Sequence, residues 1–163
     1  MQASQLFEKF LKDKKDSHYN YEENSDYCVS SGSLKLDIEM GGGIRPGIVR
    51  ATGVAEGGKT SCGLAFAKNF QESVKNGFVI YFKSEGRLSE RMLERSGVDR
   101  NPEIFRVLES NSYENTLECI RTFVKESKEN GFKCLFIIDS MDALVPDGDA
   151  TKSFSEANKV AGG

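Results

Sequence analysis

The sequence predicts a domain of the α/β class, with a doubly wound, mainly parallel sheet and helices on both of its faces. Two observations predict it. Short apolar runs alternate with amphipathic stretches from residue 48 onward, and the runs are apolar almost throughout. Such strands are typical of parallel sheets that helices cover on both sides. The chain has 163 residues, of which 38% are hydrophobic, so it can form one domain with an ordinary core.

The predicted strands and helices alternate strictly along the chain. Each predicted strand is a short run rich in Ile, Val, Leu and Phe, whereas each predicted helix carries apolar residues at helical spacing and a glycine at its end. The last helix aligns Leu117, Ile120, Phe123 and Val124 on one face. Upstream, residues 43–49 (GIRPGIV) predict a tight turn. The predicted order is strand 48–52, helix 60–77, strand 78–82, helix 88–97, strand 104–108, helix 115–131 and strand 133–139.

A shorter amphipathic stretch opens the chain. Its apolar residues share one face of a predicted helix over residues 3–11, and a polar run follows. This helix packs either on its own domain or on a neighbouring subunit, and periodicity does not separate these alternatives. We therefore expect two units: residues 1–28, a helix and linker that form a candidate protomer-docking arm, and residues 29–163, the core.

Charge and cysteine content narrow the class of protein. The net charge of −3 does not favour a permanent nucleic-acid surface, so a contact with DNA would be local or shared between subunits. The four cysteines are far apart and form no CxxC pair, which favours reduced thiols over disulfides or a metal site. No apolar run reaches membrane-spanning length, and the first residues do not fit a signal peptide, so we expect a cytoplasmic protein.

A glycine-rich segment lies between the first predicted strand and the helix that follows it. Residues 53–60 (GVAEGGKT) fit the pattern G-x-x-x-x-G-K-[ST] of a phosphate-binding loop, in the strand-loop-helix context that this pattern requires. Glycines allow the backbone N–H groups to point at a polyphosphate, and the helix N-terminus adds about half a positive charge. Lysine and threonine then supply a cation for the β- and γ-phosphates and a hydroxyl for Mg²⁺. The residues expected at the nucleotide are Gly53, Val54, Ala55, Glu56, Gly57, Gly58, Lys59, Thr60 and Ser61.

Two carboxylates follow predicted strands and complete the expected site. Asp139 ends the apolar run CLFIID, where a carboxylate can hold Mg²⁺ through water, together with Thr60. Glu85 follows the strand FVIYF at the same edge of the sheet, where ligands bind in such folds. A carboxylate there can accept a proton from water aimed at the γ-phosphate. These residues predict an ATP and Mg²⁺ site. From its position alone, Glu85 is either the catalytic base of this site or an exposed loop glutamate, and the second is the simpler interpretation.

Four segments together resemble the ATP-binding core of RecA-type recombinases. They are residues 30–49 (SSGSLKLDIEMGGGIRPGIV), 53–61 (GVAEGGKTS), 82–99 (FKSEGRLSERMLERSGVD) and 134–146 (CLFIIDSMDALVP), in this order and with nearly uninterrupted spacing. The first and third segments make the resemblance more specific than a phosphate loop alone.

The resemblance implies a DNA-dependent ATPase that assembles helical filaments on single-stranded DNA and pairs it with a homologous duplex, for recombination and repair. It implies that Glu85 activates water and that Lys59, Thr60 and Asp139 bind phosphates and metal. It places Ser140 beside the nucleotide, and Ser89 and Met92 near the adenine. It also makes the N-terminal helix a candidate for packing on the adjacent protomer, as in a homo-oligomer or filament.

Three features depart from the family pattern. Ala55 and Glu56 replace the usual Glu and Ser, and Glu56 would repel a triphosphate unless its side chain points outward. Lys83 stands where an aspartate is common, and either pairs with Glu85 or faces solvent. The DNA-binding loops and γ-phosphate sensor of the family are not recognisable before Gly163, so the core is expected to be incomplete at its C-terminus.

Two other functions fit the same residues. One is a nucleotide-gated assembly module that binds ATP but hydrolyses little, which Glu56, Lys83 and the unrecognised C-terminal part favour. The other keeps the RecA core for another task, as in hexameric helicases, RadA-like repair ATPases or KaiC-type oscillator ATPases.

Overall fold

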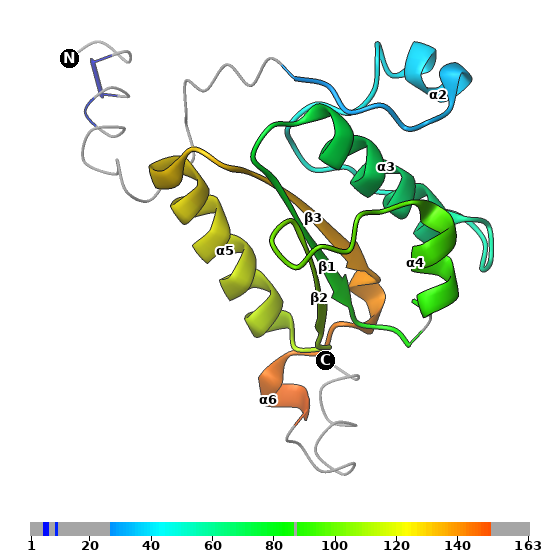
Figure 1. The fold of residues 1–163 in the computed structure, drawn as a ribbon. Helices are drawn as coiled ribbons and strands as arrows, with labels where there is room; N and C mark the ends of the chain where they lie inside the picture. Colours follow the sequence, from blue (N-terminus) through cyan, green and yellow to red (C-terminus); the bar gives the residue numbers. More distant parts are fainter. Residues whose placement is uncertain (1–4, 7–8, 10–26, 87, 151–163) are drawn as a thin grey trace.

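A parallel three-stranded sheet forms the centre of the computed structural model (Figure 1), which describes residues 5–6, 9, 27–86 and 88–150. The strands are β1 (Gly77–Lys83), β2 (Phe105–Glu109) and β3 (Lys133–Asp139), in the order β2-β1-β3. Both pairings of β1 are parallel. The structure thus confirms the α/β class and the parallel sheet.

Helices cover both faces of this sheet (Figure 1). On one face, α3 (Lys59–Ser73) and α4 (Glu90–Ser96) enclose a core that includes Phe70 of α3 and Tyr81 of β1. On the other face, the ring of Phe123 from α5 (Tyr113–Asn130) stacks on Phe78, with centroids 5.7 Å apart. Since successive residues of a strand point to opposite faces, Phe78 and Tyr81 place α5 and α3 on opposite sides.

The helix ends match their sequence signals. Ser89 and Ser112 are the N-caps of α4 and α5, and each side chain accepts a hydrogen bond from a backbone N–H in the first turn. Gly97 and Gly131 follow the two helices in the left-handed conformation, with φ of 71° and 72°. The predicted helix ends at these glycines are therefore confirmed.

The end of α3 was predicted too late. The helix ends at Ser73, and Gly77 is the first residue of β1 rather than a helix stop. Gly77 is needed for a close approach: a Cβ there would lie 2.7 Å from Cε1 of Phe70. The glycine thus lets the strand begin directly beneath the largest buried side chain of α3.

The predicted strand over residues 48–52 is wrong for the described part of the chain. No strand or bridge there includes these residues, and Ile48 and Val49 are 103% and 58% exposed. A strand needs a neighbour for its backbone N–H and C=O groups. Within the described ranges, no neighbour pairs with this segment, although its apolar composition suits a strand.

A short helix, α2 (Leu34–Glu39), was not predicted. Ser33 is its N-cap, and the Asp37 carboxylate accepts hydrogen bonds from the Ser30 hydroxyl at 2.5 Å and from the Ser31 N–H and hydroxyl at 2.7 and 2.6 Å. These bonds hold the pKa of Asp37 below its ordinary value of 3.8. The segment is tied to α3 through the Asn69 side chain, which donates to the Ser30 carbonyl at 2.8 Å.

The predicted apolar face of α5 is only partly correct. Phe123 lies against the sheet, but Leu117 is 42% exposed. Thr116 is fully buried instead, and its hydroxyl has a partner because it donates to the Ser112 carbonyl of the preceding turn at 2.9 Å. The 3₁₀-helix η1 (Met141–Ala143) and the short helix α6 (Asp147–Ala150) follow β3.

The cysteines do not form disulfides within the described residues. All four cysteines are free and half-buried. Burial, with Cys119 nearby, raises the pKa of Cys134 to about 11, which disfavours its reactive thiolate. Within the described residues, no helix has the length and apolar character needed to cross a membrane. The predicted N-terminal helix falls largely outside the described residues.

Replacing Phe70 tests the packing of α3 on the sheet. Phe70→Ala should lower the free energy of unfolding by about 3–5 kcal/mol, because it leaves a cavity in a closely packed core. Ile48→Ala is the matched control, and this exposed side chain should change the free energy by less than about 0.5 kcal/mol. Both are measured by urea denaturation. A large loss for Ile48→Ala would contradict the exposed position of this side chain.

The Asp37 cluster predicts a pH-dependent contribution to stability. A carboxylate with a lowered pKa stabilises the fold above its unfolded pKa, and this contribution is lost as pH falls toward the folded value. Asp37→Asn should therefore lower the melting temperature at pH 7, and the difference from wild type should shrink below about pH 4. Thermal melts from pH 7 to pH 3 measure it. A difference that stays constant would contradict the assignment.

Candidate functional site

The glycine-rich loop lies exposed at the start of α3. Gly58 is the N-cap of this helix, with φ of 87°, and Gly57 N–H donates to the Val54 carbonyl at 3.2 Å. The Lys59 ammonium folds over the loop and donates to the carbonyls of Gly53 and Val54 at 3.0 and 2.9 Å. The ammonium therefore already contacts the backbone of the glycine-rich loop.

Glu56 has an unusual backbone conformation in this loop. Its φ is 59°, a left-handed value that glycine adopts without strain, and the residue is exposed. The loop as a whole is exposed from Gly53 to Gly58. This exposure leaves room for the Glu56 carboxylate to point away from a triphosphate.

A cluster around one carboxylate oxygen joins the loop helix to the sheet. The Thr60 hydroxyl donates to Oδ2 of Asp139 at 2.7 Å, although the two residues are 79 positions apart in the chain. The Tyr81 hydroxyl donates to the same oxygen at 2.5 Å. The structure thus brings together the two residues that the sequence predicted as a metal site, at the carboxyl end of β3.

Tyr81 is the residue of this site that the sequence analysis missed. Its side chain is fully buried in β1, and burial, reinforced by the hydrogen bond to Asp139, raises the pKa of its hydroxyl above the ordinary value of 10. The hydroxyl is therefore a lasting hydrogen-bond donor. The available signal was one hydroxyl-bearing residue inside the apolar run FVIYF, since a buried tyrosine hydroxyl usually needs a partner.

The predicted catalytic carboxylate has a partner on the neighbouring strand end. The Ser140 hydroxyl donates to Oε1 of Glu85 at 2.6 Å, and the Ser84 hydroxyl donates to the Ser140 carbonyl at 2.7 Å. The N–H groups of Ser84 and Glu85 both donate to the Asp139 carbonyl, at 3.1 and 3.2 Å. The turns after β1 and β3 are thus held together, and Glu85 lies beside Ser140.

Lys83 does not pair with Glu85. It contacts Glu109 of β2 at 2.8 Å, directly across the strand pair. The exposed position of Glu109 makes this ion pair a minor contribution to stability. The chain therefore uses Lys83 to link two strands, and of the two predicted alternatives neither is correct.

The residues expected near the adenine lie on α4. The Ser89 hydroxyl accepts a hydrogen bond from the Met92 N–H at 3.3 Å, which is a capping contact. Ser61 lies exposed in the first turn of α3. Among the described residues, no side-chain hydrogen bond joins Ser61, Ser89 or Met92 to the Thr60–Asp139 cluster.

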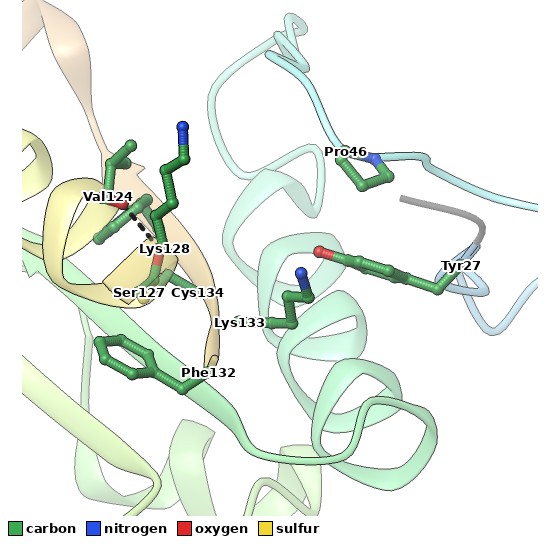
Figure 2. Close-up of a pocket in the computed structure, with 9 residues that line it drawn as sticks. Tyr27, Pro46, Val124, Ser127, Lys128, Phe132, Lys133 and Cys134 are labelled. Atoms are coloured by element: carbon green, nitrogen blue, oxygen red, sulfur yellow. Dashed lines mark hydrogen bonds between the residues drawn. The ribbon is translucent and has the colours of Figure 1, made fainter. Parts of the chain in front are cut away.

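A separate pocket of about 150 Å³ lies near the amino end of β3 (Figure 2). Tyr27 and Pro46 form one of its walls, opposite residues from α5 and the start of β3. It lies at the opposite end of β3 from Asp139, so it is distinct from the cluster described above. Its lining residues are Tyr27, Pro46, Val124, Ser127, Lys128, Phe132, Lys133, Cys134 and Phe136.

The fold and these contacts define the class of protein: a parallel α/β domain whose glycine-rich loop opens a helix that is hydrogen-bonded to a carboxylate at a strand end. The model of the RecA N-terminal domain matches residues 9–161, nearly the whole chain. The chain therefore belongs to this family of RecA-type recombinases, as the resemblance indicated. A search of curated proteins gives no match.

Proposed function

We propose that the chain binds Mg²⁺-ATP at its glycine-rich loop and that Glu85 supports hydrolysis there. The observation that carries the proposal is the hydrogen bond from Thr60 to Asp139. It joins a hydroxyl that follows the loop lysine to a carboxylate at a strand end, which is the pairing that holds Mg²⁺ in phosphate-loop proteins. We also propose that the sheet belongs to a doubly wound RecA-like core.

The oxygen atoms at this site suit Mg²⁺. Magnesium prefers hard oxygen ligands and keeps several water molecules, so one hydroxyl and one carboxylate are an adequate protein contribution. Thr60 would contribute its hydroxyl oxygen, and Asp139 would act through water. When bound, the ion neutralises charge on the phosphate oxygens. Lys59 would leave the carbonyls of Gly53 and Val54 and bind the β- and γ-phosphates.

The position of Glu85 is compatible with a role as the general base. Its carboxylate lies at the same sheet edge as Asp139, joined to it through the backbone of the two turns. A proton from water aimed at the γ-phosphate would pass to this carboxylate. Ser140 donates to one of its oxygens, which orients the group.

Family membership supports a role in recombination. We propose that the protein acts as a DNA-dependent ATPase in filaments on single-stranded DNA, which it pairs with homologous duplex, and that its N-terminal segment docks on the next protomer. The low net charge of −3 agrees with DNA contacts that several subunits share.

A second function is an assembly module that binds ATP but hydrolyses it slowly. One observation favours it: the Ser140 hydroxyl already occupies one oxygen of Glu85. ATP turnover with and without single-stranded DNA separates the two functions. Turnover that DNA stimulates supports the ATPase, and negligible turnover with retained binding supports the assembly module.

Replacing the loop lysine tests nucleotide binding. Lys59→Ala should weaken ATP binding by about 10- to 100-fold, because hydrogen bonds to charged groups contribute about 1.5–3 kcal/mol. Binding is measured by titration with a fluorescent ATP analogue. Lys68→Ala is the matched control on the same helix, since Lys68 pairs with Glu72 on the surface. Equal affinities for all three proteins would remove the loop from the proposed site.

Replacing Glu85 tests hydrolysis separately from binding. Glu85→Gln should keep ATP affinity and lower the rate of hydrolysis by about 10²- to 10⁴-fold, as expected for the loss of a general base. Phosphate release in the presence of single-stranded DNA measures it. Glu90→Gln is the control, because that exposed carboxylate pairs with Arg100 on the surface. Undiminished turnover in Glu85→Gln would exclude Glu85 as the base.

A further inference from the structure

We propose that Tyr81 is a positioning residue for the metal ion, because its hydroxyl determines which oxygen of Asp139 remains for Mg²⁺. The inference rests on the proposed function, and adds to that site a residue that the phosphate-loop pattern does not include.

The position of the Tyr81 hydroxyl is fixed by packing. Its ring lies in the middle of the central strand, fully buried in the core cluster that also contains Leu64 and Phe70 of α3. A ring that is packed on all sides has little rotational freedom, so the position of its hydroxyl is fixed relative to the sheet. That hydroxyl reaches Oδ2 of Asp139 at 2.5 Å.

Both hydroxyl donors of the cluster bind the same carboxylate oxygen. Thr60 donates to Oδ2 as well, at 2.7 Å. Within the described part of the chain, no hydrogen bond is made to Oδ1, so this oxygen is the one left for water on the metal. Because Thr60 gives its hydrogen to Asp139, its lone pairs are available to the ion. Two donors on one oxygen thus orient both protein groups that the ion needs.

Loss of the Tyr81 hydroxyl would remove one of these two restraints. Asp139 would then be held by Thr60 alone, and its carboxylate could rotate about its terminal torsion, which has a broad energy minimum. Partners that orient metal-binding groups typically change metal affinity by about 10- to 100-fold when they are replaced. The effect should therefore appear in the dependence on Mg²⁺ rather than in the binding of phosphates by the loop.

A purely structural role for Tyr81 makes a different prediction. A buried hydroxyl needs a partner, and Asp139 would serve that need without any consequence for the ion. In that case Tyr81→Phe would change stability, and nucleotide binding would change equally with and without metal. A positioning role changes the Mg²⁺ dependence and leaves metal-free binding intact.

The experiment measures binding of a fluorescent, non-hydrolysable ATP analogue as MgCl₂ is titrated, and again in excess EDTA. For Tyr81→Phe, the Mg²⁺ concentration at half-saturation should rise about tenfold, with unchanged affinity in EDTA. Tyr113→Phe, an exposed tyrosine on α5, should match wild type in both. In an Asp139→Asn background, Tyr81→Phe should add no further increase, because the carboxylate that it orients is already gone.

The outcomes separate this inference from the proposed function. Wild-type protein that does not bind the analogue contradicts the proposed function. Wild-type protein that binds it with a Mg²⁺ dependence that Tyr81→Phe leaves unchanged overturns the role of Tyr81 alone. Equal losses in Mg²⁺ and EDTA, or an additive effect in the Asp139→Asn background, overturn it as well.

A second measurement covers a variant that does not fold. Wild-type protein carrying ¹³Cζ-labelled tyrosine is titrated with Mg²⁺ and the analogue, after the other four of its five tyrosines have been assigned by replacement with Phe. The Tyr81 resonance should move when Mg²⁺ is added to the analogue complex and stay in place when EDTA is added instead. A resonance that ignores Mg²⁺ overturns the inference.

Discussion

The hydrogen bond between Thr60 and Asp139 is the constraint on which the site depends. It spans 79 residues and fixes the first turn of α3 against the carboxyl end of β3. The glycine-rich loop immediately precedes Thr60, and the turn that carries Ser140 immediately follows Asp139. One contact therefore sets the distance between the loop and the strand-end carboxylates. In the core, Phe70 packs against Gly77, and this contact keeps α3 close to the sheet, so that Thr60 can reach Asp139.

The fold could be predicted from the sequence where local signals and packing agree. Gly97 and Gly131 end helices in the left-handed conformation, which glycine adopts without strain, and this preference is local. The predicted strand over residues 48–52 is wrong because a strand needs a paired neighbour, and a run of apolar residues does not show which segment pairs with it. The predicted helix end at Gly77 is wrong because the sequence does not distinguish a glycine that allows a close approach in space from a glycine that ends a helix.

In the candidate site, too, residues in local sequence patterns could be predicted, whereas contacts that depend on neighbours in space could not. Thr60 and Asp139 could be predicted as partners because the phosphate-loop pattern fixes Thr60, and Asp139 ends an apolar strand at the same edge of the sheet. Tyr81 could not, since its role depends on a hydroxyl that reaches two residues further along the neighbouring strand. Lys83 was misjudged for a similar reason: the nearest carboxylate in sequence is Glu85, whereas the nearest in space is Glu109 on β2.

The outer position of β2 has a consequence for how this molecule meets others of its kind. Val107 and Leu108 are partly exposed in a strand that has no partner on one side in the described part of the chain. This combination favours lateral addition of a foreign strand and hence aggregation. Arg106 and Glu109 flank these two residues. Charged flanks would have to lose water in any such addition, and this cost opposes it.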